Sequence, residues 1–128
     1  MKKMQTEIAI VDDDATLRGS LARLLEACSY RVRTYETAKE FLNSNRAQMS
    51  SCLILDLEME GMTGAVLQHY LTVTGAKIPV IILTGHDAPW VRERCQEAGA
   101  AAFLVKPFKP DQLLMTVAAA LSTQATAA

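Results

Sequence analysis

The sequence predicts an α/β fold: a five-stranded parallel sheet in the order 2-1-3-4-5 with helices on both faces, doubly wound and flavodoxin-like. Short aliphatic runs alternate five times with segments of helical periodicity along the 128 residues, which is typical of βα units. The runs at 53–55 and 80–83 are continuous and apolar, as in strands buried on both faces. Right-handed crossovers then leave few topologies, and this strand order fits a chain of this length.

The first part of the chain predicts two strands, each followed by a helix with a side-chain cap. A strand is expected at residues 6–11, and Asp14 is placed to cap the helix that follows it. Residues 31–35 alternate as in a short, half-buried strand. Thr37 and Glu40 then form the capping-box pattern at the start of the next helix.

The second part continues the alternation and ends in a polar tail. Strands are expected at residues 52–56, 78–84 and 101–105, and helices at 66–71 and 111–121. The helix after the fourth strand is expected to be capped by Asp87, to carry Pro89 in its first turn and to stop at Gly99. One domain then covers residues 1–121, and the segment 122–128 is expected to fray as a tail or as the start of a linker.

Composition argues against several functional classes. The formal net charge is -1 with no basic run, so we expect no direct nucleic-acid binding by this domain, because phosphate contacts need clustered Lys and Arg. The apolar stretches are too short to span a bilayer and no signal peptide is visible, so we expect no membrane partner. Cys28, Cys52 and Cys95 match no metal-ligand spacing and are typical of reduced thiols in a cytoplasmic protein.

Five polar side chains lie at or just beyond the carboxyl ends of the predicted strands: Asp12, Asp13, Asp56, Thr84 and Lys106. Ligands bind at this edge of a parallel sheet. Carboxylates gathered in one crevice repel one another, by roughly 4 kcal/mol for a pair ~4 Å apart at an effective dielectric of about 20. A divalent cation would offset this repulsion, and Mg²⁺, with Mn²⁺ as an alternative, suits hard oxygen ligands.

The same side chains suit the transfer of a phosphoryl group to a carboxylate. Asp56 stands alone at the end of a central, buried strand and is the best nucleophile for forming an aspartyl phosphate. Asp12 and Asp13 would hold the metal ion, and Lys106 would supply a movable positive charge. Thr84 has a hydroxyl that can donate a hydrogen bond to a phosphoryl oxygen.

Four segments carry a resemblance to a known family. They are Val11-Asp12-Asp13-Asp14, Leu53-Ile54-Leu55-Asp56 with Gly61-Met62-Thr63-Gly64, Leu83-Thr84-Gly85, and Lys106-Pro107-Phe108. In their order and separations they resemble the receiver domain of bacterial two-component response regulators, over nearly the whole chain. The resemblance implies a phosphorylation-activated signalling switch rather than an enzyme. A sensor histidine kinase would phosphorylate Asp56 with Mg²⁺, and the domain would catalyse only its own phosphoryl transfer and dephosphorylation.

The resemblance also implies roles for residues around the site. The backbone carbonyl of Glu58 would join the three aspartates as a metal ligand, and the peptide between Lys106 and Pro107 would be cis. Thr84 would turn inward to bond the phosphoryl group, and Phe103 would follow it as the switch aromatic. A plain core aromatic on the last strand is an equally good interpretation of Phe103.

On the output side, the sequence is most similar to receivers that precede helix-turn-helix transcription domains. The resemblance implies that the fourth helix, fifth strand and fifth helix form a face that is remodelled to control an output domain or downstream protein. Phosphorylation-dependent homodimers are a further implication. The chain is either a free-standing receiver or a domain of a longer regulator. Trp90, in the first turn of the fourth helix, is either a partner-contacting aromatic or half-buried packing.

Glu58, Glu60 and His86, together with Trp90, are expected to give the chain its individuality. Many receivers have proline where this chain has Glu60, so the loop after Asp56 is expected to be looser. Glu58 and His86 occupy positions that, in the family, tune attack by water on the acyl phosphate, and we expect them to alter the phosphoryl lifetime. A solvated neighbour of a helix cap is the plainer interpretation of His86. The alternative function is a phosphorylation-independent, receiver-like scaffold, because an intact site does not prove its use.

Overall fold

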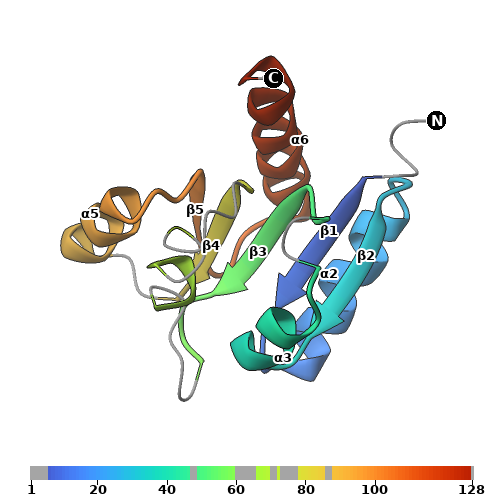
Figure 1. The fold of residues 1–128 in the computed structure, drawn as a ribbon, viewed down its shortest axis with the longest axis horizontal. Coiled ribbons are helices and arrows are strands. Elements are labelled where there is room, and N and C mark those ends of the chain that lie inside the picture. Colours follow the sequence, from blue (N-terminus) through green and yellow to red (C-terminus); the bar gives the residue numbers. More distant parts are fainter. Residues whose placement is uncertain are drawn as a thin grey trace.

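The fold is built on one five-stranded parallel sheet. The computed structural model describes residues 6–46, 49–59, 66–69, 72, 78–85 and 88–127. The strands are β1 Glu7–Val11, β2 Arg31–Tyr35, β3 Cys52–Asp56, β4 Val80–Thr84 and β5 Ala102–Val105. They lie in the order β2-β1-β3-β4-β5 (Figure 1). The predicted fold class and strand order are therefore confirmed.

The strand register brings the carboxyl ends of β1, β3 and β4 to one edge of the sheet. Leu55 pairs with the last residue of β1, and Asp56 pairs with Leu83 of β4. Asp12 and Asp56 therefore lie level at neighbouring strand ends, and Thr84 is one residue further along β4.

In the described part of the chain, the helices α2 Ala15–Glu26, α3 Ala38–Asn43, α5 Pro89–Glu97 and α6 Pro110–Ala127 cover the sheet. Residues 66–69 are also helical. Asp14 caps α2 by accepting two backbone N–H bonds, at 3.0 and 3.2 Å. Thr37 accepts the Glu40 N–H at 3.1 Å, and the Glu40 carboxylate accepts the Glu36 N–H at 3.0 Å. The N-caps predicted for α2 and α3 are therefore confirmed.

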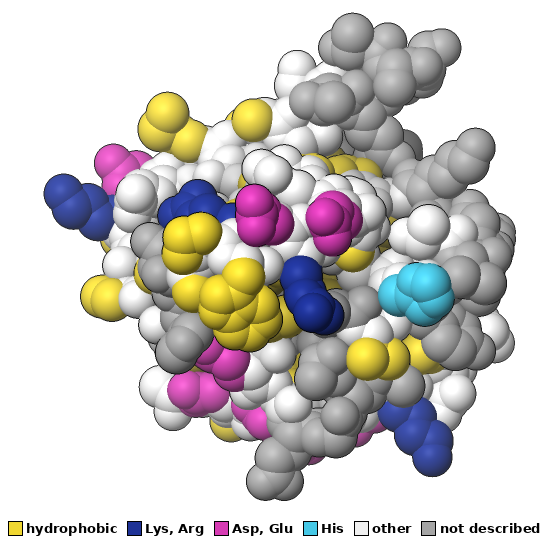
Figure 2. All heavy atoms as spheres, turned by 90° about the vertical axis from the view of Figure 1, so that its left-hand side faces the viewer, with side chains coloured by type: hydrophobic (Ala, Val, Ile, Leu, Met, Phe, Trp, Pro, Cys, Tyr) yellow, Lys and Arg dark blue, Asp and Glu magenta, His cyan; other side chains and the backbone are white. Residues whose placement is uncertain are grey.

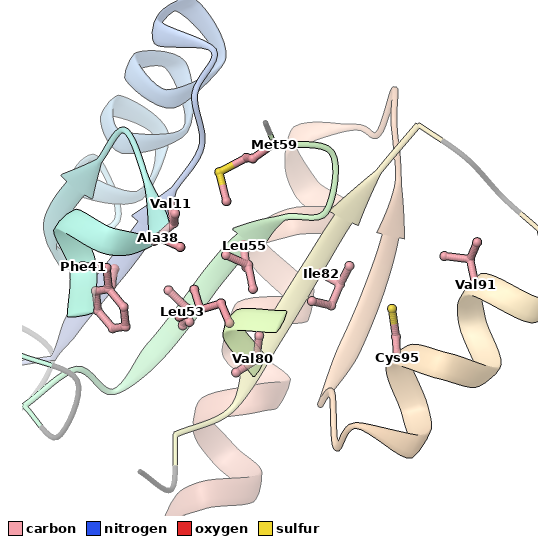
Figure 3. Close-up of a cluster of buried hydrophobic side chains, with 12 residues drawn as sticks. Val11, Ala38, Phe41, Leu53, Leu55, Met59, Val80, Ile82, Val91 and Cys95 are labelled. Atoms are coloured by element: carbon pink, nitrogen blue, oxygen red, sulfur yellow. The ribbon is translucent and has the colours of Figure 1, made fainter. Parts of the chain in front are cut away.

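Each face of the sheet carries its own hydrophobic core. One core packs strand residues against α3, the helical segment 66–69 and α5 (Figure 3): Ala9, Val11, Leu53, Leu55, Val80 and Ile82 with Ala38, Phe41, Leu67, Val91 and Cys95. The other packs strand residues against α2 and α6: Ile8, Ile10, Cys52, Ile54, Ile81 and Leu83 with Leu21, Leu25, Leu113 and Val117. Full burial of such a Val, Leu, Ile or Phe side chain contributes about 1.5–3 kcal/mol. The central strands therefore form a rigid platform for the residues at their ends.

The start of α5 differs from the prediction. Its N-cap is Ala88 rather than Asp87, and alanine offers no side-chain acceptor. Asp87 itself lies outside the described residues. Proline restricts the residue before it to extended conformations, so Pro89 makes Ala88, with φ -121 and ψ 141, the last non-helical residue.

The end of α6 also differs. The helix runs to Ala127 and so includes most of the segment that we predicted to fray. Alanine is the strongest helix former, and neither glycine nor proline interrupts residues 111–127. The division into a domain at 1–121 and a tail stays a prediction. No helix in the described part of the chain is both long and apolar enough to cross a membrane.

The opposite, amino edge of the sheet holds a buried carboxylate that is paired with two partly exposed arginines. Glu7 opens β1 and is only 3% exposed. Arg46 donates to both of its carboxylate oxygens, at 3.0 and 2.6 Å, and Arg33 Nε adds a contact at 3.3 Å. The hydrogen bond from Arg46 lowers the pKa of the Glu7 carboxyl, against the opposing effect of burial. This carboxylate is therefore held in its charged form.

Candidate functional site

Three aspartates gather at the carboxyl edge of the sheet. Asp12 and Asp13 follow β1, and Asp56 ends β3. One carboxylate oxygen of each lies within 4.8 Å of the other two. Asp12 and Asp56 are buried, whereas Asp13 is exposed. The structure thus brings together the three carboxylates that the sequence placed at strand ends.

The Asp12 carboxylate is only partly satisfied by the protein. Its Oδ1 accepts the Asp14 N–H at 2.9 Å, but Oδ2 is buried and has no hydrogen-bond partner among the described residues. Burial, together with the neighbouring Asp56 charge, raises the pKa of the Asp12 carboxyl to about 6 despite the Asp14 N–H bond. A buried acceptor without a partner costs free energy, so this oxygen favours the binding of a donor or a cation.

Asp56 is held between a backbone donor and a cationic side chain. Its Oδ1 accepts the Glu58 N–H at 3.0 Å, and its Oδ2 lies 3.2 Å from Lys106 Nζ. Lys106 follows β5, and its own N–H donates to the Thr84 carbonyl at 2.7 Å. The peptide between Lys106 and Pro107 is cis. These bonds fix both carboxylate oxygens of Asp56 at the centre of the site.

Thr84 makes a contact that the sequence analysis did not foresee. Its side chain is buried, and the hydroxyl donates to Glu58 Oε2 at 2.8 Å. The Gly85 N–H donates to the same carboxylate, at 3.0 Å to Oε1 and 3.1 Å to Oε2. Two donors at the end of β4 therefore form hydrogen bonds with a carboxylate from the loop after β3.

The donor set of this site fits a divalent cation that prefers hard oxygen ligands. Three carboxylates converge, and one buried oxygen, Asp12 Oδ2, lacks a hydrogen-bond partner in the described part of the chain. Mg²⁺ takes carboxylate and carbonyl oxygens and keeps positions open for water and phosphate. The residues present therefore fit such an ion.

Phe103 lies on β5 near the site. It pairs with Ile82, two residues before Thr84, and is half-buried against the core that contacts α5. The Arg92 guanidinium carbon lies 4.8 Å from the centre of its ring. Phe103 is thus a core aromatic by packing, and its role in switching stays a prediction.

Trp90, Glu60 and His86 are the remaining residues that the sequence analysis singled out. Trp90 is 59% exposed at the start of α5, so half-buried packing does not describe it. Figure 2 faces the side of the molecule that carries α5 and shows hydrophobic side chains gathered beside acidic and basic ones. Glu60 and His86 lie outside the described residues, and so does the loop segment 61–64.

Arg18 is a further residue beside the site, and it was not predicted from the sequence. Its Nη1 donates to the Asp12 backbone carbonyl at 2.6 Å. This bond ties the first turns of α2 to the end of β1, beside the aspartate cluster. Arg18 lies one helical turn after the N-cap Asp14, and this spacing could have indicated that the two share a helix face.

Comparisons with known proteins agree with this geometry. The family model "Response regulator receiver domain" matches residues 8–118. The transcriptional regulatory protein TdiR of Thauera aromatica is 37% identical over 115 residues, which make up 90% of this chain and 51% of TdiR. FixJ of Azorhizobium caulinodans is 36% identical over 92% of this chain and 56% of its own length. The chain thus spans about half the length of these relatives.

Solved structures show the same relationship. The response regulator StyR is similar with a TM-score of 0.88, at 35% identity over 95% of this chain and 62% of StyR. The Vibrio cholerae chemotaxis protein CheY4 gives a TM-score of 0.85 at 27% identity over 91% of this chain and 99% of CheY4. The chain belongs to the receiver domain family of response regulators.

Proposed function

We propose that this chain is a phosphorylation-activated switch whose phosphoacceptor is Asp56. The observation that supports this most is the position of the buried Asp56 carboxylate. It lies 3.2 Å from the Lys106 ammonium and within the cluster formed with Asp12 and Asp13. A nucleophilic carboxylate between a cationic side chain and a metal-binding set is what acyl phosphate formation requires.

In the proposed reaction, an Asp56 carboxylate oxygen attacks the phosphorus of a phosphohistidine on a sensor histidine kinase. The new P–O bond forms as the P–N bond breaks, and the electron pair returns to the imidazole, which takes up a proton. The Glu58 N–H orients the attacking carboxylate. Lys106 lies beside Oδ2, so its ammonium can neutralise charge on the phosphoryl oxygens. The domain would also support hydrolysis of its own acyl phosphate.

Mg²⁺, or Mn²⁺ in its place, would be held by the carboxylates of Asp12, Asp13 and Asp56 and by the backbone carbonyl of Glu58. When bound, such an ion withdraws negative charge from phosphoryl oxygens. Receiver domains bind Mg²⁺ at an acidic pocket, and the aspartate cluster is present in this chain. Asp12 Oδ2, which has no hydrogen-bond partner among the described residues, supports the same assignment.

Switching would follow from competition between two packings of the α5–β5–α6 face. Thr84 would bond the phosphoryl group, Phe103 would move with it, and the face would then engage its output. TdiR and FixJ are named as transcriptional regulatory proteins, which supports a transcriptional output. A sensor histidine kinase, an output domain or downstream protein, and a phosphorylation-dependent homodimer in the cytoplasm are the partners we propose.

We also propose that Glu58 and His86 tune the lifetime of the acyl phosphate. Glu58 directly contacts the donors at the end of β4, which supports its part of the proposal. The phosphoprotein would be isolated, and its decay compared among wild type, Glu58→Asn and His86→Ala. Unchanged decay in both variants would contradict this proposal.

The direct test of the function uses a small phosphodonor. Protein would be incubated with acetyl phosphate and Mg²⁺, and intact mass would be measured for wild type, Asp56→Asn and the surface control Asp111→Asn. We expect the mass of one phosphoryl group in wild type and in the control, and none in Asp56→Asn or after chelation of the metal. A wild-type protein that gains no Asp56-dependent mass would instead support the scaffold function.

A further inference from the structure

The carboxylate of Glu58 accepts hydrogen bonds from two donors at the end of β4, the strand that pairs with the Asp56 end of β3. Glu58 Oε2 accepts from the Thr84 hydroxyl at 2.8 Å, and both oxygens accept from the Gly85 N–H, at 3.0 and 3.1 Å. Hydrogen bonds to an ionised acceptor are stronger than those between neutral groups. The end of β4 is therefore already bound to an anion that belongs to the chain itself.

The backbone on either side of Glu58 is fixed, so its carboxylate is presented to β4 by the fold. Leu57 N–H donates to the Leu83 carbonyl at 2.8 Å, which continues the β3–β4 ladder by one residue. The Glu58 N–H is bound to Asp56 Oδ1. The next side chain, Met59, is only 7% exposed and points into the core beside Leu55 (Figure 3).

The contact between Gly85 and Glu58 leaves room for a side chain at position 85, so it does not require glycine there. A Cβ there would lie 3.6 Å from Glu58 Oε1, which is an ordinary van der Waals distance. The feature that the contact needs is a backbone N–H next to a hydroxyl. These two donors hold oxygens of one anionic group at 2.8–3.1 Å, and a phosphoryl group presents the same kind of acceptor.

We propose that Glu58 is an intramolecular competitor of the phosphoryl group. Its carboxylate holds Thr84 and Gly85 in the unphosphorylated protein and must leave them before they can bind phosphoryl oxygens on Asp56. Because Glu58 is exposed, the released carboxylate returns to water without crossing the core. The inference rests on the proposed function, and it assigns Glu58 as a positioning residue that sets how readily the phosphorylated arrangement forms.

The test measures the affinity of the protein for beryllofluoride, a phosphoryl analogue that binds an aspartate without a kinase. Beryllofluoride would be titrated with Mg²⁺ present into wild type, Glu58→Ala, Glu58→Asp and the exposed control Glu26→Ala, and followed by NMR. We expect Glu58→Ala to bind about tenfold more tightly than wild type, equivalent to about 1.4 kcal/mol. Glu26→Ala should bind as wild type does.

The Glu58→Asp variant separates competition from simple charge repulsion. It keeps the negative charge but shortens the side chain by one methylene, so the carboxylate no longer reaches both donors. Competition predicts tighter binding in Glu58→Asp as well as in Glu58→Ala. Tighter binding in Glu58→Ala alone would show charge repulsion and would overturn the inference.

A second measurement needs neither metal nor analogue. In the metal-free protein, hydrogen exchange of the Gly85 amide should accelerate in Glu58→Ala, because the donor loses its acceptor. In the beryllofluoride titration, the gain of affinity in Glu58→Ala should also shrink in a Thr84→Val background, because the effects of contacting residues are not additive. An unchanged Gly85 amide, or unchanged affinity on loss of Glu58, overturns the competition while leaving the proposed function intact. If neither wild type nor Glu58→Ala binds beryllofluoride, the proposed function fails and the inference fails with it.

Discussion

Two buried acidic residues at opposite ends of one strand show opposite electrostatics. Glu7 opens β1 and Asp12 directly follows it, and both are at most 3% exposed. Both oxygens of Glu7 accept hydrogen bonds from Arg46, and the pKa of its carboxyl is lowered. Asp12 keeps a buried oxygen without a partner in the described part of the chain, and the pKa of its carboxyl is raised to about 6.

The difference shows how one fold separates structural from functional charge. At the amino edge, both oxygens of the buried Glu7 carboxylate have hydrogen-bond donors within the protein, so the ion pair contributes to stability without any ligand. At the carboxyl edge, burial and repulsion by Asp56 destabilise the charged form of the Asp12 carboxyl, and a bound cation would offset both effects. Unfavourable electrostatic interactions of this kind are typical of functional sites, and they lower the stability of the ligand-free protein.

The largest change in stability should come from disrupting the ion pair between Glu7 and Arg46 at the amino edge of the sheet. Glu7→Gln removes the charge that Arg46 binds at both oxygens. We expect the free energy of unfolding to fall by roughly 1.5–3 kcal/mol, the range for hydrogen bonds to charged groups. Urea denaturation at neutral pH measures this loss, with the exposed Glu26→Gln as control. A loss no greater than that of the control would show that the pair is not stabilising.

Replacing the Asp12 carboxylate at the carboxyl edge by the matching amide should change the stability in the opposite direction. Asp12→Asn removes a buried charge that lies against Asp56, so metal-free protein should become more stable by roughly 1–2 kcal/mol. Urea denaturation in a chelator measures the change. A destabilised variant would contradict the view that Asp12 carries uncompensated charge.

The pH dependence of stability should report the Glu7 pair. The pKa of the folded-state Glu7 carboxyl lies below its ordinary value of 4.5, so its contribution is complete above that value and is lost as pH falls through the folded-state pKa. The gap between wild type and Glu7→Gln should stay constant from pH about 7 to about 5 and close below about 4.5. A gap that widens on acidification would reverse this assignment.

The smallest effect should come from the outer arginine of the pair. The Arg33 side chain is 47% exposed and contacts Glu7 at 3.3 Å, so solvent screens most of the interaction. Arg33→Gln should lower the free energy of unfolding by less than about 1 kcal/mol, and less than Glu7→Gln does. Denaturation of Arg33→Gln and Glu7→Gln in one buffer compares the two losses directly, and equal losses would contradict the view that solvent screens the Arg33 contact.

Local patterns were sufficient to predict the fold and the central residues of the site. The Cys52–Asp56 strand, the Asp14 and Thr37 caps, and the aspartate cluster follow from periodicity and from where strands end. Contacts between distant segments were not predictable in this way. Arg46 is 39 residues from Glu7, and Glu58 reaches Thr84 across 26, so neither pair leaves a periodic signal.

The predicted N-cap of α5 was wrong for a local reason. Asp87 was predicted as the cap from its side-chain acceptor alone, whereas Pro89 restricts the residue before it and so makes Ala88 the N-cap. The extent of α6 was misjudged because small, polar composition was given more weight than the helix propensity of alanine. Both corrections lie away from the carboxyl edge and leave the site unchanged.

The measurement that tests the comparison most directly is the stability of the protein as a function of Mg²⁺. Binding to the folded state alone should stabilise wild type by about 2.7 kcal/mol when free Mg²⁺ reaches about a hundred times its Kd. Glu7→Gln should gain the same increment, whereas Asp12→Asn should gain little or none. Equal gains in wild type and Asp12→Asn would contradict the claim that the carboxyl edge of the sheet is a cation site that Asp12 completes.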